Sequence, residues 1–456
     1  MKKITLFFVL MSVLTLNAQD FWTEIAPFPV SNLAPKQISI VNNNVVWVYT
    51  SRAFSSTIDK WSVSTDGGFT WQNGDFYLGS TNLNVCSIFG ISATKAYITA
   101  YDATGSSTIN SGGVWMTQDA GISWVKQTSA AFNNASSFPN FIHFFDQNNG
   151  VVAGDPINGV YEIYTTNNGG SNWTAVSSAN IPFALGSNEW GLTLNFNTYN
   201  NNIWFGTSYG RIFKSSNQGL SWTATQSPVS DFGGTTNLSE SAGFTYKNEN
   251  EGILINNFLN IFRTLDGGQT WNDETSTVTG VLRNFKTVYV PMTANTIFAW
   301  GADINDERGS SYSTDGGNNW INLNTQTDVI PLTTTFNSGT SAFCVGFTSA
   351  DPTLKFYKLT DPLYRLNSGS LNSDGFDLIS NATVSPNPSN GIFNVKSKDV
   401  INQIEIFDIA GKKIKTIVIN ALSEISLNIS ELENGIYFAR LSTDNKNNSL
   451  IKLIKN

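Results

Sequence analysis

The sequence has few of the residues on which metal, redox and nucleic-acid chemistry depends. Its 456 residues include two cysteines and one histidine, and only 13% are charged. Two cysteines exclude a scaffold built on several disulfides and a zinc cluster held by thiolates. A net charge of −8 argues against the basic surface that nucleic-acid binding requires. After residue 18, no stretch stays apolar for long enough to form a membrane-spanning helix.

What the sequence does contain is apolar and aromatic. Hydrophobic residues make up 40% of the chain and aromatic residues 13%. A chain of this length and composition can bury a core, which excludes global disorder. At about 150 residues per domain, the length predicts two or three domains.

The first 18 residues are typical of a secretory signal peptide. Lys2 and Lys3 precede an apolar run from Ile4 to Leu16, and Ala18 stands at the expected cleavage point. The run is too short to span a bilayer, and the alternative is a buried helix. We therefore expect residues 1–18 to be removed and the mature protein to work outside the cytoplasm.

A repeated pattern runs through the next part of the chain: Ser/Thr, any residue, Asp/Asn, any residue, Gly, two further residues, Trp. The six segments are Ser64–Trp71, Thr117–Trp124, Thr166–Trp173, Ser215–Trp222, Thr264–Trp271 and Ser313–Trp320. Their third position is Asp66, Asp119, Asn168, Asn217, Asp266 or Asp315. A step of 53 residues separates the first two tryptophans, and each later step is 49. Such regular spacing indicates a repeat architecture.

The residue types of the pattern are those of a tight turn between two strands. The Asp or Asn side chain accepts hydrogen bonds from nearby backbone N–H groups, and the Gly allows a positive φ. The Trp then opens the outgoing strand with a large apolar surface. We therefore assign these residues a structural role rather than a catalytic one.

The pattern resembles the Asp-box, or BNR repeat, of β-propellers. That repeat occurs in sialidases, sortilin-type receptors, xyloglucan-degrading glycosidases and photosystem II assembly factors. The Asp-Gly-Gly-x-Thr-Trp form at Asp66–Trp71 and Asp266–Trp271 is most similar to the sortilin and assembly-factor type. The resemblance covers residues 19–365 and implies a β-propeller.

Seven blades are expected, of which the last is split between the two ends of the propeller. Upstream of each repeat lie further β-rich runs, which gives four strands per blade. Residues 333–359 supply three more strands but no box, and Trp22 lies 49 residues before Trp71. The N-terminal strand should therefore close the ring; six blades with residues 333–359 as a cap is the alternative. Cys86 and Cys344 fall in separated blades and are expected to be buried free thiols.

The chain changes character after residue 365. Residues 366–380 are rich in Gly, Ser and Asn and read as a linker. Residues 381–456 carry nine basic and seven acidic residues, against fifteen and twenty-seven in residues 19–380. Six or seven short alternating strands predict a small Ig-like β-sandwich there.

This second module resembles the type A sorting domain of the bacterial type IX secretion system. The matching stretches are Ser385–Gly391, Ile406–Lys412, Leu432–Arg440 and the basic tail Lys452–Lys455. The resemblance implies recognition by the type IX machinery and a final location that is secreted or on the outer-membrane surface. An unrelated Ig-like domain is the alternative.

The propeller face opposite the boxes is the expected ligand site, because loops gather there around the channel mouth. Ligand-binding candidates on it are Arg52, Tyr101, Asp102, Trp190, Tyr209, Phe258 and Arg308. If the protein is a hydrolase, its carboxylates would come from Asp155, Glu189, Asp303 and Asp306. The arginine pattern of sialidases is missing.

No cofactor is expected from the sequence. A single histidine, His143 in a predicted first strand, cannot form a zinc site alone. Asn/Asp-rich loops could hold calcium, but none has EF-hand spacing.

Three functional hypotheses follow. The first is a binding or scaffolding propeller for a carbohydrate or protein ligand, without catalysis. The second is a secreted glycosidase acting on polysaccharide, which requires paired carboxylates at the channel mouth. The third is an assembly factor that docks on another envelope protein through a broad patch.

Overall fold

The computed structural model describes residues 21–28, 33–52, 59–104, 112–130, 132–237, 239–323, 329–359, 382–408, 413–443 and 448–456. The chain divides into two compact units between Leu366 and Asn367. The expected signal peptide and linker, residues 1–18 and 366–380, lie outside the described residues.

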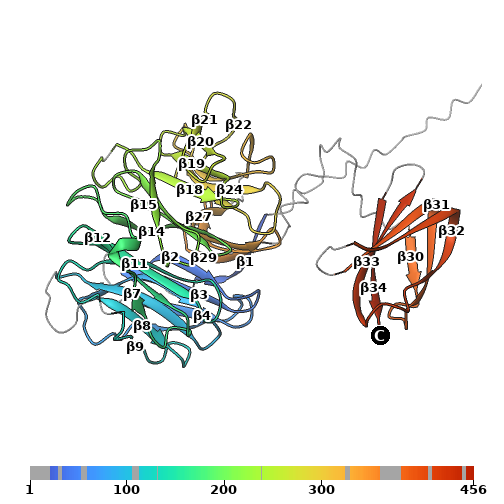
Figure 1. Ribbon diagram of the computed structural model, residues 1–456, viewed down its shortest axis with the longest axis horizontal. Helices are drawn as coiled ribbons and strands as arrows, with labels where there is room; N and C mark the ends of the chain where they lie inside the picture. The colour runs from blue at the N-terminus through green and yellow to red at the C-terminus, as the bar shows by residue number, and fades with distance from the viewer. Residues whose placement is uncertain are drawn as a thin grey trace, which may run out of the picture. The chain divides into compact units, whose positions relative to one another are not determined.

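The first unit is a seven-bladed β-propeller, as the repeat predicted (Figure 1). Each blade is an antiparallel sheet whose innermost strand lies at the centre of the ring. Blade 1 contains β2 (Leu33–Ile40), β3 (Val46–Arg52), β4 (Lys60–Ser64) and β5 (Gln72–Asp75). Blade 2 contains β6 (Leu83–Gly90), β7 (Ala96–Asp102), β8 (Gly113–Thr117) and β9 (Val125–Lys126). Blade 3 contains β10 (Pro139–Phe144), β11 (Gly150–Ile157), β12 (Val160–Thr166) and β13 (Thr174–Ala175).

Blades 4 to 6 repeat the same order. Blade 4 contains β14 (Gly191–Tyr199), β15 (Asn202–Thr207), β16 (Arg211–Ser215) and β17 (Thr223–Gln226), and a 3₁₀ turn, η1 (Ser178–Asn180), precedes it. Blade 5 contains β18 (Ala242–Tyr246), β19 (Gly252–Asn256), β20 (Ile261–Thr264) and β21 (Asn272–Asp273). Blade 6 contains β23 (Lys286–Tyr289), β24 (Ile297–Ala302), β25 (Arg308–Ser313) and β26 (Asn319–Asn322), and β22 (Thr279–Gly280) adds a short parallel edge to β26.

Blade 7 is built from both ends of the propeller sequence. Its inner strands are β27 (Val329–Ser338), β28 (Ser341–Thr348) and β29 (Lys355–Leu359), and its outer strand is β1 (Trp22–Pro27). The β1–β29 ladder runs antiparallel from Trp22 opposite Leu359 to Pro27 opposite Lys355. The N-terminal strand therefore closes the ring as predicted, and the six-bladed alternative is wrong.

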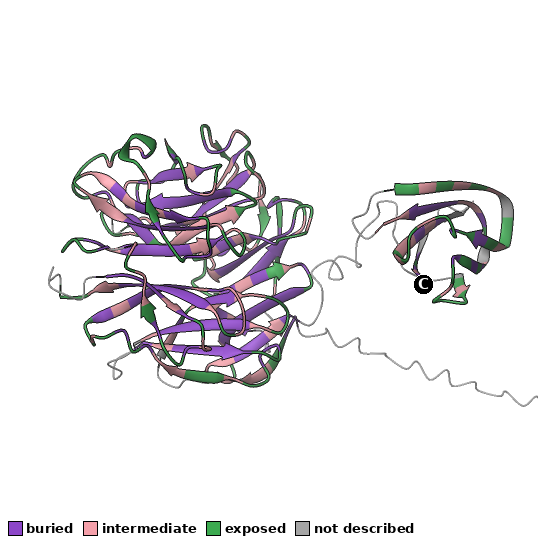
Figure 2. Cartoon of the chain, turned by 60° about the horizontal axis from the view of Figure 1, so that its bottom comes forward, coloured by how far each residue is buried: buried purple, intermediate pink, exposed green. Residues whose placement is uncertain are grey.

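The core of the propeller lies between blades rather than at one centre. Among the described residues, a hydrophobic cluster fills the space between each pair of neighbouring blades. The second strand of each blade is buried along most of its length. Figure 2 shows buried segments, in purple, throughout the propeller. Cys86 in β6 and Cys344 in β28 are buried free thiols in separate blades.

The six box turns share one set of hydrogen bonds. In the first turn, the Gly68 N–H donates to Ser64 Oγ at 2.8 Å, and the Thr70 N–H donates to Asp66 Oδ1 at 2.9 Å. The same Gly-to-hydroxyl bond recurs in the other five turns, and each of these glycines lies between φ +78° and +98°. The turn therefore needs a side-chain oxygen at its third position and a Gly at its fifth.

Asp66→Ala is expected to lower the thermal midpoint by a few degrees, whereas Asp66→Asn changes it little. Alanine removes the acceptor that fixes the Thr70 N–H, while asparagine keeps it. In another box turn, asparagine already occupies this position. Asn217 Oδ1 accepts from the Ser221 N–H at 3.0 Å, and Asn217 Nδ2 donates to Ser221 Oγ at 2.9 Å. Calorimetry of both variants tests this; equal losses for Ala and Asn would contradict it.

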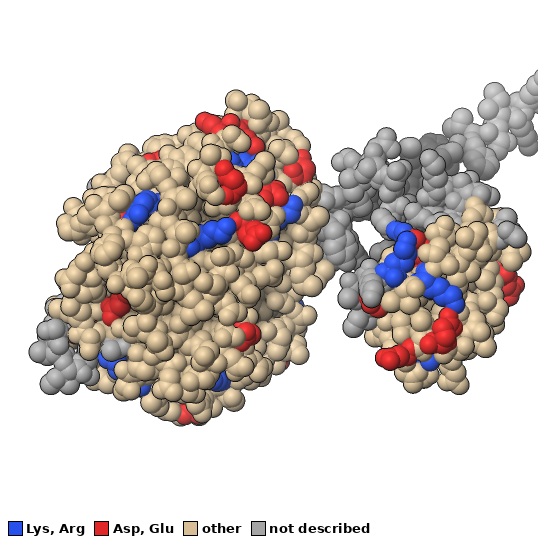
Figure 3. Space-filling model, in the orientation of Figure 1, with Lys and Arg blue, Asp and Glu red and all other residues tan. Residues whose placement is uncertain are grey.

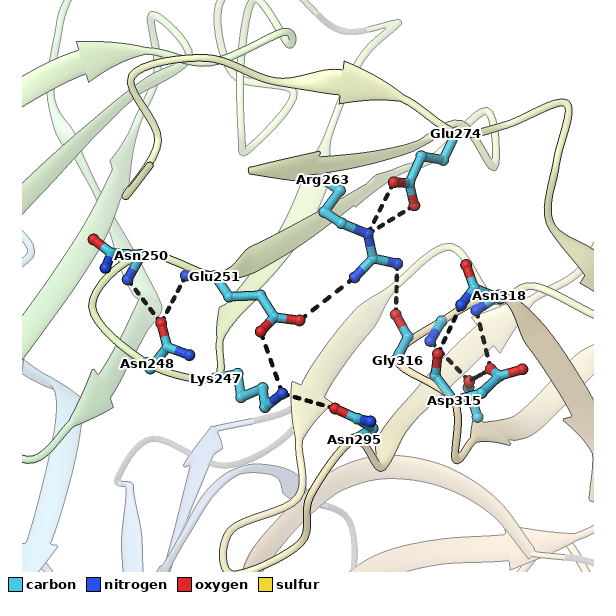
Figure 4. A network of polar contacts seen from close by, with 12 residues as sticks. Lys247, Asn248, Asn250, Glu251, Arg263, Glu274, Asn295, Asp315, Gly316 and Asn318 are labelled. Carbon is cyan, nitrogen blue, oxygen red and sulfur yellow. Dashed lines mark hydrogen bonds and ion pairs between the residues drawn. The ribbon is translucent and has the colours of Figure 1, made fainter. Parts of the chain in front are cut away.

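Charged side chains join neighbouring blades at the box end of the propeller (Figure 4). Arg263 on β20 donates to the Gly316 carbonyl in the next box at 2.6 Å and pairs with Glu274 at 2.8 Å. Lys247 donates to Asn295 Oδ1 of the next blade at 2.7 Å. Because these groups satisfy one another across the blade boundary, we assign this network to structure.

The second unit is a small β-sandwich with its own core. Its strands are β30 (Ala382–Ser385), β31 (Ile392–Phe407), β32 (Lys413–Asn428), β33 (Gly435–Thr443) and β34 (Asn448–Lys455). The first part of β31 pairs with β30 and the last part pairs with β33. Both layers contribute to one hydrophobic cluster that includes Phe393, Ile404 and Leu453.

This sandwich has fewer and longer strands than the sequence predicted. The apolar runs expected as separate short strands are continuous in β31 and β32. Register shifts between Lys396 and Gln403 interrupt the β31–β32 ladder where the other partner of β31 changes from β30 to β33. In the part of the chain that the structure describes, no helix is long and apolar enough to cross a membrane.

Candidate functional site

A central cavity of about 1020 Å³ runs into the ring of innermost strands. Its wall comes mainly from β2, β14, β18, β23 and β27, with Phe89 of β6. At one end it is bounded by the first residues of β2 and β27, by Asp306 of the β24–β25 connection and by Arg308, the first residue of β25. The box turns belong to the other end of the blades, so this end of the cavity, called its mouth below, lies on the expected loop face.

An irregular segment of β14 forms part of the cavity wall. The β14–β15 ladder breaks between Gly191 and Phe196, and within that break Leu194 adopts φ +59°. A leucine in the left-handed region is strained, so surrounding contacts must hold it. The Leu194 carbonyl accepts a hydrogen bond from Lys286 Nζ at 3.3 Å.

Lys286 is a cation of the channel interior. It opens β23 and lines the cavity, and burial lowers the pKa of its ammonium from 10.5 to about 8. The other charged residues of the lining are Lys36, Asp306 and Arg308. Three basic groups and one acidic group thus line a cavity in an otherwise acidic propeller.

Aromatic side chains form the part of the cavity wall that lies beside blade 3. The His143 ring lies edge-on to Phe89 at 5.1 Å and to Phe145 at 4.8 Å, and it also meets Phe196 at 6.3 Å. Burial lowers the pKa of His143 to about 3, so the ring is neutral. His143 therefore packs in the channel wall. No group of three or more His, Cys, Asp or Glu residues that could hold a metal occurs among the described residues.

Asp155 stands behind the cavity wall and joins blades 3 and 4. Its Oδ1 accepts from Asn140 Nδ2 at 2.7 Å and from the Gly191 N–H at 3.0 Å. Burial is the largest influence on its pKa and raises it to about 7. Asp155 is not part of the cavity lining.

The variant Asp155→Asn is expected to be more stable than the parent protein at pH 8 and similar to it at pH 4. The pKa of Asp155 is higher in the folded protein than in the unfolded chain, so its contribution to stability is greatest below about pH 3.8. It declines as the pH rises toward 7. Asparagine keeps the Oδ1 acceptor without the buried charge. Thermal midpoints of both proteins between pH 4 and 9 measure the difference, and a gap independent of pH would contradict this explanation.

Glu189 forms a buried ion pair. Its carboxylate accepts from Arg211 Nε at 2.8 Å and Nη2 at 2.7 Å, and also from Thr207 Oγ1 and the Leu185 N–H. The Glu189 side chain is 0% exposed, and Arg211 also donates to the Phe183 carbonyl. Both oxygens are therefore occupied, and the pair anchors the long loop before blade 4.

Asp303 organises the β24–β25 connection. Its Oδ1 accepts from the N–H groups of Asn305 and Glu307, and its Oδ2 lies 3.6 Å from Arg283 Nη1. Arg283 is itself buried and donates to Asn322 Oδ1 at 2.8 Å. Asp306, in the same connection, is exposed and lines the cavity mouth. Of the four proposed carboxylates, Asp306 is the one that the cavity contains.

The ligand-binding candidates are dispersed over the loop face. Arg308 lines the cavity, whereas Phe258 is 57% exposed outside it. Tyr101 packs on Phe138 at 4.2 Å, and Asp102 binds the Thr104 hydroxyl and N–H, which lower its pKa.

The remaining candidates also lie apart from the cavity lining. Trp190 packs against the cluster between blades 4 and 5. Tyr209 lies in the β15–β16 turn, and its carbonyl accepts from Gln226. Arg52 ends β3, and its side chain lies outside the described ones.

Sequence reasoning missed Lys36 and Lys286, the two lysines of the cavity. Both stand at or near the start of a first strand, and the first strands line the channel. These two lysines could therefore have been found from their position within the repeat, but not from any sequence motif.

Comparison with known proteins supports both units. Residues 383–456 match the family described as "Secretion system C-terminal sorting domain". This agrees with the resemblance to type IX sorting domains, and the protein is accordingly secreted or located on the outer-membrane surface. No curated protein matches the chain.

The propeller is similar in fold to two structures of YCF48. YCF48 bound to D1 peptide is 16% identical, with a TM-score of 0.52, and the match covers 76% of this chain and 97% of that one. YCF48 from Cyanidioschyzon merolae is also 16% identical, with a TM-score of 0.51 and coverage of 74% and 98%. At this identity the likeness concerns the fold alone.

Proposed function

We propose that the propeller is a non-catalytic binding module whose ligand enters the central cavity, and that the type IX machinery exports it through the C-terminal sandwich. The observation that carries this proposal is the charge of the cavity: among the residues that line it, Asp306 is the one carboxylate. A glycosidase needs two carboxyl groups roughly 5–10 Å apart on either side of the scissile bond.

The other acidic candidates are engaged elsewhere. Glu189 is bound on both oxygens by Arg211 and its neighbours, Asp303 holds a turn, and Asp155 joins two blades. The raised pKa of Asp155 would suit a general acid, and this is the one feature that favours the glycosidase hypothesis. Asp155 lies outside the cavity lining, which argues against that role.

The proposal is tested with the purified full chain on a panel of polysaccharides and peptides, assayed for retention and for released sugar. Peptides belong in the panel because a protein of the same fold is described with a bound peptide. Retention without release supports a binding module. Released sugar overturns it, and Asp155→Asn together with Asp306→Asn would then show which carboxyl group is responsible.

A further inference from the structure

Lys286 is a partly buried cation that lines the cavity, and it has no anionic partner among the described residues. Its Nζ makes one hydrogen bond, to the Leu194 carbonyl at 3.3 Å. An ammonium group carries three donors, so two of them remain for a ligand. Burying a charge without an opposite charge is costly. An anion in the cavity would offset that cost.

The other charged residues of the lining add to the positive charge of Lys286. Lys36 and Arg308 also line the cavity, and Asp306 is the single acidic residue there. The chain as a whole carries a net charge of −8, and the visible propeller surface is mostly uncharged (Figure 3). A cleft lined by one sign of charge concentrates its field and attracts the opposite sign.

The uncharged lining favours a sugar chain over a peptide. Amide side chains recur around the cavity. The amide oxygens of Gln37 and Asn284 already accept backbone N–H groups, whereas Asn195 Oδ1 has no partner among the described residues. Amides both donate and accept hydrogen bonds, as ring hydroxyl groups require. At the mouth, Phe285 is 56% exposed and offers a flat apolar surface against which a pyranose ring can pack.

We infer that the cavity binds an acidic polysaccharide, with a uronate carboxylate on Lys286 and an adjoining sugar ring against Phe285. This inference rests on the proposed binding function and names the class of its ligand. Lys36, an exposed lysine of the lining, attracts a further carboxylate of the same polysaccharide. The C-terminal sandwich places the propeller outside the cell, where such polysaccharides are accessible.

Isothermal titration of the full chain with an oligogalacturonate, and with its methyl-esterified form as a neutral analogue, tests the inference. The acidic probe is expected to bind, and the neutral form about 10- to 100-fold more weakly. Lys286→Met should weaken binding of the acidic probe by a similar factor and leave the neutral form unchanged. Lys286→Arg should retain most of the affinity, and Lys396→Met, an exposed lysine of the sandwich, should have no effect. Circular dichroism checks that each variant is folded.

The pH dependence provides an independent check. Lys286 loses its proton as the pH rises through about 8, so affinity for the acidic probe should decline between pH 7 and 9. The other charged groups that line the cavity are Lys36, Asp306 and Arg308. Binding of neutral polysaccharide or peptide but not of the acidic probe would overturn this inference and leave the binding function intact. Release of sugar would overturn both.

Discussion

A chain truncated after Thr443 is expected to stay inside the cell envelope, with almost none reaching the surface. The truncation removes β34, which pairs with β33 from Asn448 to Lys455 and places Ile451 and Leu453 in the sandwich core. The same strand holds the Ser385–Gly391 loop, because Asn387 Nδ2 donates to the Lys452 carbonyl at 2.7 Å and Asn387 Oδ1 accepts from the Ile454 N–H at 2.8 Å. Fractionation of cells that possess a type IX system measures the loss.

A matched variant separates folding of the sandwich from the charge of its tail. Lys452→Ala keeps the backbone of β34 and removes an exposed positive charge. If export depends on the folded sandwich, this variant reaches the surface at a near-normal level. Surface location of the truncated chain would contradict the assignment of export to this domain.

Trp22→Ala is expected to destabilise the propeller by about 3–5 kcal/mol, the usual cost of removing a buried tryptophan. Trp22 is 6% exposed and lies against Phe21, Phe298 and Phe336, which join the closing strand to blades 6 and 7. With the average unfolding entropy per residue, this cost corresponds to a decrease of roughly 4–7 °C in the thermal midpoint of a propeller of this size. Scanning calorimetry measures the shift.

Glu24→Ala on the same strand is the matched control. Glu24 faces solvent and pairs with Lys355 at 2.8 Å, and an exposed ion pair of this kind contributes about 1 kcal/mol at most. A chain that starts at residue 29 would leave the edge of β29 unpaired and should aggregate. Equal midpoints for Trp22→Ala and Glu24→Ala would show that the closing strand contributes little.

The architecture could be predicted because it is repeated. The spacing of the box tryptophans defines the blades, and Trp22 falls on the same period, which located the missing strand of blade 7. The sandwich was predicted as a class but not in its strand count. The interruptions of the β31–β32 ladder arise from register shifts between partners far apart in sequence, which an alternating pattern does not encode.

The site could be predicted only in part, because its geometry depends on neighbours in other strands and other blades. Glu189 has the residue type of a catalytic acid, but its partner Arg211 lies across the blade. Asp155 meets Gly191 of the next blade. Lys286 carries no motif, and its importance comes from the break in β14 that turns the Leu194 carbonyl toward it.

Because β1 closes the ring, the order of synthesis decides when the propeller can be completed. During synthesis the closing strand emerges first, and its partner β29 emerges only after more than 300 further residues. Until then β1 has no strand to pair with, and blades 1 to 6 can assemble without it. The ring can therefore be completed only when the whole propeller sequence has been made, so that a prematurely terminated chain carries an open edge that quality-control proteases can recognise.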